Sequence, residues 1–118
     1  MRILTPETVN QNSKRTLTQL FTADIKQVNT YSVTRGAILG NHYHKETYEY
    51  FYILKGSFLV QTGKKTGNLN LTEVVLGPKS LFVVEPYTVH TIESLSKDGQ
   101  FMTFLTQEFK QESPDIYV

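Results

Sequence analysis

Residues 36–56 read GAILGNHYHKETYEYFYILKG and hold two of the three histidines of the chain. The second half of this stretch, residues 48–56, is rich in aromatic residues and ends on a glycine, which is typical of a β-strand. Successive side chains of a strand point to opposite faces, so Glu49 shares a face with Phe51 and Ile53. That apolar face is expected to point into the core, where a carboxylate is costly unless a partner neutralises it.

The histidines are candidates for that partner. His42 and His44 are separated by one residue, which places both imidazoles on one face of an extended chain. His90 opens a later strand and shares its face with Ile92. A lone histidine near a strand end is more often a surface or core-edge residue, and it is the combination with an inward Glu49 that favours a metal. Imidazole and carboxylate ligands suit Fe, Mn, Zn, Ni or Cu ions and leave coordination positions open for a substrate.

Short β-rich segments recur about every ten residues on both sides of this stretch, and turn signals such as GKKTGN at 63–68 separate them. No helical stripe is longer than two turns. The pattern predicts an all-β sandwich or small barrel that closes around a ligand or a metal ion. The predicted strands cover residues 16–21, 25–33, 48–56, 57–62, 69–76, 81–85, 89–95 and 100–106.

The length of 118 residues suits one domain. Residues 1–16 are polar and irregular, and we expect an N-terminal arm or a lead-in strand there. Residues 17–110 would form the barrel, and residues 111–118 a polar C-terminal tail. Phe51, Phe58 and Phe82 are expected in the core.

Composition excludes several classes of protein. Twelve Lys/Arg against eleven Asp/Glu leave a net charge of +1, so no basic face indicates nucleic acid as a partner. The absence of cysteine excludes a disulfide scaffold and thiolate chemistry. No apolar run is long enough for a membrane span, and no signal peptide is recognisable at the N-terminus. We therefore expect a soluble, cytoplasmic protein.

The same residues resemble the two sequence motifs of the cupin superfamily. The first motif is matched by Gly36, His42, His44, Glu49 and Gly56. Gly77, Pro86 and His90 resemble the second motif, although Tyr87 stands where glycine is typical and Glu85 replaces a proline. The resemblance implies a single-domain, RmlC-like cupin, a jelly-roll barrel known as a double-stranded β-helix. It also implies a homodimer and one divalent metal ion (Fe, Mn, Zn or Ni) with the ligands His42, His44, Glu49 and His90.

A narrower resemblance concerns the sugar-nucleotide cupins of surface-polysaccharide pathways. GNHYHK at 40–45, EYFYILKG at 49–56 and the lead-in KRTLTQLF at 14–21 carry it. In the 3,4-ketoisomerases of this group, paired histidines act as acid/base residues. By that resemblance His42 and His44 would be catalytic, with Arg35 as a further candidate and Tyr43 or Tyr48 close by.

Three classes of function remain open. The first is a metal-dependent enzyme, of oxygenase or isomerase type, that acts on a small oxygen-rich molecule, and Glu49 in register with the histidines favours it. The second is a nucleotide-sugar isomerase or epimerase that uses His42 or His44 as acid/base. The third is a barrel that binds a small molecule without turnover. A nucleotide-sugar enzyme should carry basic groups at the mouth of the barrel, and the candidates are Arg35, Lys45, Lys55, Lys64 and Lys65.

Overall fold

The computed structural model describes residues 1–67 and 69–118, and across these residues the fold is all-β, as predicted. No helix in this part of the chain is long and apolar enough to cross a membrane. The strands are β1 Arg2–Leu4, β2 Glu7–Gln11, β3 Thr16–Gln19, β4 Gln27–Val33, β5 Ile38–His42, β6 Glu49–Lys55, β7 Phe58–Lys64, β8 Thr72–Leu76, β9 Leu81–Val84, β10 Thr88–Ser94 and β11 Gly99–Leu105.

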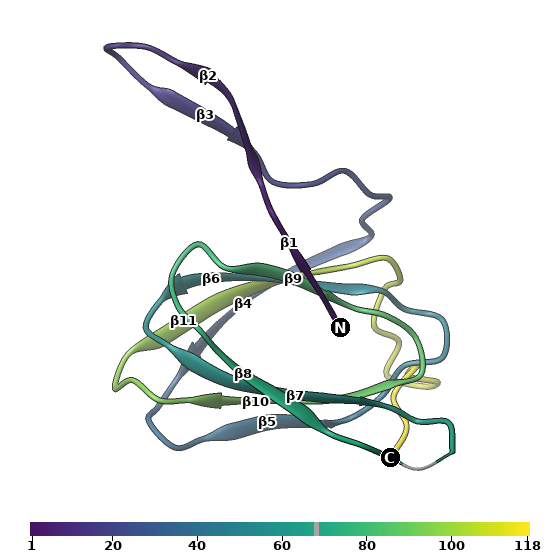
Figure 1. Cartoon of the computed structure of the whole chain (residues 1–118). Coiled ribbons are helices and arrows are strands. Elements are labelled where there is room, and N and C mark those ends of the chain that lie inside the picture. The colour runs from purple at the N-terminus through teal and green to yellow at the C-terminus, as the bar shows by residue number, and fades with distance from the viewer. Residues whose placement is uncertain (68) are drawn as a thin grey trace.

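Two antiparallel sheets pack face to face and form the predicted jelly roll (Figure 1). The larger sheet has five strands in the order β1-β9-β6-β11-β4, and the smaller has four in the order β5-β10-β7-β8. Strands that follow one another in sequence often belong to different sheets, so the chain crosses repeatedly between the layers. One of these crossings, residues 43–48, joins β5 to β6 and lies within the stretch 36–56 that matches the first cupin motif.

The core lies between the sheets and is largely aromatic. Phe51, Phe58 and Phe82 are all buried, as predicted, and the rings of Phe51 and Phe82 stack with centroids 4.7 Å apart. On β11, Phe101 points into this core, whereas Phe104 lies on the opposite face. Burying such a side chain contributes about 1.5–3 kcal/mol to stability, so this layer holds the two sheets in register around the site.

Residues 1–16, where we expected an arm or a lead-in strand, contain β1 and β2. β1 pairs with β9 at the edge of the five-stranded sheet, and β2 and β3 form a hairpin that projects from the body (Figure 1). The strand expected at 16–21 is therefore β3, and it does not join either large sheet. All of its residues are exposed, because its polar residues leave it no apolar face to bury. The hairpin spans the boundary that we placed at residue 16, and the division into domains stays a prediction.

Other differences concern one strand that was not predicted and the ends of two others. β5 was not among the predicted strands, because glycine and asparagine interrupt its short apolar pattern. β7 runs on to Lys64, so it includes the first residues of the loop predicted at 63–68, and residue 68 of that loop lies outside the described residues. β8 begins at Thr72 rather than at residue 69.

Candidate active site and metal centre

The four residues singled out by the sequence come together between the two sheets. Glu49 is the first residue of β6 in the five-stranded sheet, whereas His42 ends β5 and His90 belongs to β10 in the four-stranded sheet. His44 lies on the crossing that joins β5 to β6. One nitrogen or oxygen atom from each of the four lies within 4.8 Å of the others.

A β-bulge in β5 determines the direction of His42. His42 pairs with His90 and Gly40 pairs with Thr91, so Asn41 is an extra residue in this strand. Leu39 points into the core, and strict alternation from there would turn His42 outward. The extra residue restores the inward direction. The prediction that His42 and His44 share one face of a strand was therefore wrong, because β5 ends at His42 and a bulge and a crossing bring the rings together.

Gly40 makes the bulge possible. Its φ is +95°, in the left-handed region that favours glycine. A Cβ atom at this position would lie 2.6 Å from the carbonyl oxygen of His90. The close approach of the two backbones thus requires a residue without a side chain.

Glu49 lies between two imidazoles. Its Oε1 is 3.0 Å from Nε2 of His44 and 3.6 Å from Nε2 of His90, and the side chain is buried, as predicted. Burial alone would raise the pKa of Glu49, but the hydrogen bond from His44, the close approach of His90 and the charges of the two rings outweigh it and lower the pKa to about 2. The Nδ1–H of His90 donates to the carbonyl of Thr88 at 3.2 Å, which turns Nε2 toward the carboxylate.

His44 is held at both ring nitrogens by acceptors. Nε2 faces Glu49, and Nδ1 is 2.7 Å from the main-chain carbonyl oxygen of Asp115. Both nitrogens must therefore donate, which requires the charged imidazolium. Burial lowers the pKa of His44, but the hydrogen bonds to Glu49 and to the Asp115 carbonyl raise it more, so the net shift is upward.

His42 has the opposite electrostatic character. Burial is the main cause that lowers its pKa to about 4, and the neighbouring charges of His90 and His44 add to the effect. Its ring centroid lies 4.7 Å from that of His90 and 5.1 Å from that of His44. His42 is therefore a neutral imidazole at pH 7, able to accept a proton or to offer a lone pair to a metal.

The donor set fits a divalent metal ion. With bonds of about 2.1 Å, one ion spans ligand atoms up to about 4.2 Å apart, so a spread of 4.8 Å needs only a small contraction. Such an ion would take the place of the Nε2 proton of His44 while the Nδ1–H stays bonded to a carbonyl, the usual arrangement of a ligating histidine.

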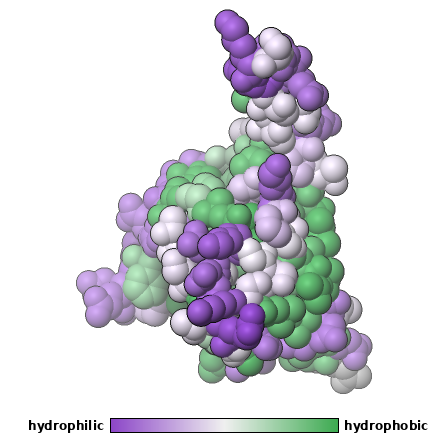
Figure 2. Space-filling model, turned by 90° about the vertical axis from the view of Figure 1, so that its left-hand side faces the viewer, coloured by the Kyte–Doolittle hydropathy of each residue, from purple (hydrophilic) through white to green (hydrophobic). Residues whose placement is uncertain are grey.

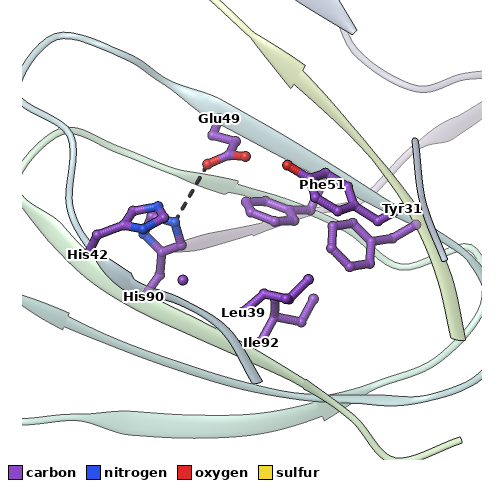
Figure 3. Close-up of a pocket in the computed structure, with 9 residues that line it drawn as sticks. Tyr31, Leu39, His42, Glu49, Phe51, His90 and Ile92 are labelled. Atoms are coloured by element: carbon purple, nitrogen blue, oxygen red, sulfur yellow. Dashed lines mark ion pairs between the residues drawn. The ribbon is translucent and has the colours of Figure 1, made fainter. Parts of the chain in front are cut away.

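A cavity of about 460 Å³ opens beside this cluster, and a smaller one adjoins it. His42 and Glu49 line both, and Figure 3 shows the smaller one, with Tyr31 reaching in from β4 toward the side that carries Glu49. The larger cavity is lined by Gln27, Asn29, Thr30, Tyr31, His42, His44, Glu49, Leu105, Phe109 and Ile116.

The inward face of β4 was missed by sequence reasoning. Gln27, Asn29 and Tyr31 alternate along this strand and line the larger cavity, whereas Val28 points outward and is 51% exposed. Burial, and then the nearby charge of Glu49, raise the pKa of Tyr31, so its hydroxyl stays protonated. The signal that could have revealed this face is the period-two spacing that places Gln27, Asn29 and Tyr31 on the same face as the apolar Val33.

The basic candidates are not brought to the cavity. Arg35 is exposed in the turn between β4 and β5, at the end of β5 remote from His42. Lys55 ends β6 and lines a different pocket. Lys45 and Lys65 lie over the rings of Tyr117 and Tyr43, 4.1 and 5.5 Å from their centroids. Among the described residues that line the two cavities at the cluster, there is no Lys or Arg.

Comparison with protein families agrees with this architecture. The profile of the family described as the polysaccharide biosynthesis C-terminal domain matches residues 11–117. The chain belongs to this family. The comparison with curated proteins found no match by sequence.

Several solved structures have a fold similar to that of this family member. The capsular polysaccharide assembling protein CapF from Staphylococcus aureus is 23% identical with a TM-score of 0.71, and the match covers 97% of this chain and 32% of CapF. QdtA, a sugar 3,4-ketoisomerase from Thermoanaerobacterium thermosaccharolyticum solved with TDP, is 15% identical with a TM-score of 0.77, and the match covers 97% of this chain and 84% of QdtA.

A third similar structure is dTDP-4-dehydrorhamnose 3,5-epimerase from Elizabethkingia anophelis, 16% identical with a TM-score of 0.79, matched over 94% of this chain and 71% of the epimerase. These likenesses confirm the RmlC-like cupin fold. The chain spans about a third of the length of CapF.

Proposed function

We propose that this domain isomerises or epimerises a nucleotide-linked keto sugar by moving a proton at a carbon next to the carbonyl. The observation that carries the proposal is that an imidazole, His42, and a phenol, Tyr31, line the wall of one cavity beside Glu49. A base and an acid in complementary protonation states are what proton transfer beside a carbonyl requires. This is the second of the functions that the sequence left open.

The geometry favours His42 over His44 as the base. His44 uses both ring nitrogens in hydrogen bonds, so it has no lone pair to offer. In the proposed step, a ring nitrogen of His42 takes the proton from the carbon, and the C–H electron pair forms the enolate. The Tyr31 hydroxyl donates a proton to the developing negative oxygen. To complete an isomerisation, His42 returns the proton to the neighbouring carbon while the hydroxyl of the first carbon gives its proton to the Tyr31 phenolate. To complete an epimerisation, the enol gives its O–H proton back to Tyr31 while water protonates the other face of the first carbon, and His42 releases its proton to water.

The substrate class rests on the relatives. QdtA was solved with TDP, and a mutant of it with TDP-4-keto-6-deoxyglucose. In this chain Gln27 and Asn29 offer amide groups to sugar hydroxyls within the larger cavity. The diphosphate would then lie outside the two cavities, because their described lining has no Lys or Arg.

A metal-dependent reaction is the second candidate, and the convergence of His42, His44, Glu49 and His90 favours it. A bound divalent ion would supply Lewis-acid polarisation of a substrate oxygen. The two proposals make different demands on His42, because one lone pair cannot serve both a metal and a substrate proton. Metal analysis of protein purified without chelator, beside the same analysis of His42→Asn, therefore tests this candidate. Absence of bound metal in the wild type would remove it.

The isomerase proposal is tested by proton exchange. Incubation with TDP-4-keto-6-deoxyglucose in D₂O should remove the proton NMR signal at the carbon next to the carbonyl and produce a new sugar. Removing a general acid or base typically costs 10²- to 10⁴-fold in rate, so we expect about that loss in His42→Asn and in Tyr31→Phe.

Tyr52→Phe is the matched control, because Tyr52 lies on the outer face of β6, away from the cavity. It should retain the wild-type rate. If wild-type protein exchanges no proton on this sugar or on other nucleotide-linked keto sugars, the proposal is wrong. Equal rates in Tyr31→Phe and the control would exclude Tyr31 as the acid.

A further inference from the structure

Asp115 lies after the last strand of the fold, yet it holds the crossing that carries His44. Its carboxylate accepts hydrogen bonds from the backbone N–H groups of Lys45, Glu46 and Thr47, each at 2.9 Å. The Thr47 hydroxyl donates to the same carboxylate at 2.8 Å. One side chain thus satisfies four donors of a single turn, and these bonds lower the pKa of Asp115 against the opposing effect of burial.

The main chain of the same residue contacts the ring of His44. The Nδ1–H of His44 donates to the Asp115 carbonyl oxygen at 2.7 Å, across a separation of 71 residues. The carboxylate therefore fixes the position of residue 115 relative to the turn, and the carbonyl then fixes the ring. Because Nδ1 is held on one side, Nε2 must point to Glu49 and the cluster.

Neighbouring residues reinforce this attachment. We define the strap as residues 109–117. Tyr43 immediately precedes His44, and Tyr117 lies two residues after Asp115. The backbones of these two tyrosines exchange two hydrogen bonds of 2.9 Å. At the other end of the strap, the backbone N–H of Phe109 donates to Oε1 of Gln27 at 2.8 Å. Phe109 and Ile116 form part of the wall of the larger cavity.

We propose that Asp115 is the positioning residue of this site: it sets the orientation of the His44 ring through its carbonyl, and its carboxylate keeps that carbonyl in place. It does not touch the cavity of the proposed reaction and acts only through His44. The inference rests on the proposed role of the site as a centre for proton transfer or metal binding. Removing a residue that orients a metal-binding histidine through a hydrogen bond typically lowers metal affinity or activity by about 10- to 100-fold.

The first test reads the His44 ring directly. In long-range ¹H–¹⁵N NMR spectra of the imidazoles, wild-type protein should show a slowly exchanging Nδ1–H for His44. In Asp115→Ala this proton should exchange rapidly, and the ¹⁵N shifts should indicate a ring free to rotate. Asp115→Asn keeps one accepting oxygen and should lie between the two. Glu112→Gln, a neutralised and exposed carboxylate of the same strap, is the matched control and should resemble the wild type.

The second test measures zinc affinity by competition with a coloured chelator. We expect Asp115→Ala to bind Zn²⁺ about 10- to 100-fold more weakly than Glu112→Gln. If Asp115→Ala does not fold, Thr47→Val removes one of the four donors and should give a smaller change in the same direction. Unchanged His44 spectra together with unchanged zinc affinity would overturn the proposal.

The two proposals fail separately. If the wild type exchanges no substrate proton, the proposed isomerase function is wrong, and if it binds no metal, the metal-dependent candidate is removed. The NMR comparison then decides the role of Asp115 alone: loss of the protected Nδ1–H in Asp115→Ala supports it, and retention overturns it.

Discussion

His42 and His44 are separated by one residue in sequence, yet they differ in charge because their surroundings differ. His44 gains acceptors at both nitrogens, and its pKa rises. His42 becomes buried and lies beside two other imidazoles, and its pKa falls to about 4. The stability from His44 is fully present below the unfolded pKa of 6.5 and is lost as the pH rises through its folded value. The contribution of His42 to stability has the opposite sign, because its pKa in the folded protein lies below 6.5.

We expect His42 to destabilise the chelator-treated protein as the pH falls from 6.5 toward about 4. In this interval the unfolded chain binds a proton at His42 and the folded protein does not, so the free energy of unfolding decreases. Urea unfolding of wild type and His42→Asn across this interval measures the effect. The variant should lose stability less steeply, and parallel curves would show that His42 is not buried as a neutral ring.

At the scale of elements, turns and a bulge rather than whole strands aim the site residues. The bulge at Asn41 turns His42 inward. In the turn before β10, Tyr87 has a φ of +61°, at the position where the cupin motif typically has glycine. The departure from the motif therefore keeps the left-handed backbone that glycine would supply, and the Tyr87 N–H donates to the His44 carbonyl at 2.7 Å.

Two glycines with similar backbone angles allow a controlled test of the bulge. Gly36 and Gly40 have φ values of +83° and +95°, but a Cβ atom meets nothing within 4 Å at Gly36 and lies 2.6 Å from a backbone oxygen at Gly40. We expect Gly36→Ala to cost about 1 kcal/mol, the conformational penalty alone.

Gly40→Ala should cost more than Gly36→Ala and also weaken zinc binding, because β5 must separate from β10. Urea unfolding and chelator competition on both variants give the comparison. Equal losses of stability and of zinc affinity in the two variants would mean that the site does not require the close contact between β5 and β10.

At the scale of the whole molecule, the outer face of the five-stranded sheet is apolar and only partly covered. Phe21 stacks on Tyr50 with centroids 4.3 Å apart, while Val28 and Leu54 are 51% and 44% exposed. Figure 2 shows apolar residues gathered at the top of the body, beneath the projecting hairpin. An isolated, fully exposed hairpin is marginally stable in water, so both features favour the predicted homodimer.

We expect the protein to be a dimer in size-exclusion chromatography with light scattering, and Leu54→Lys to shift it toward monomer, because a charge at an apolar interface is costly. Val75→Lys is the control, since Val75 is 58% exposed but lies in β8 of the other sheet. A monomeric wild type would contradict the homodimer, and an equal effect of both variants would place the interface elsewhere.

The sequence by itself determined the fold class, the aromatic core and the inward direction of Glu49, because strand alternation is local and the motif spacing brings the histidines to the same end of the fold. Only the tertiary structure decided how His42 is aimed, which histidine is charged, and that Tyr31 and Asp115 belong to the site. The bulge depends on pairing between β5 and β10, and the Asp115 contact spans 71 residues. Such long-range hydrogen bonds produce no periodic pattern of residue types in the sequence, whereas burial of the apolar face of a strand produces an alternating one.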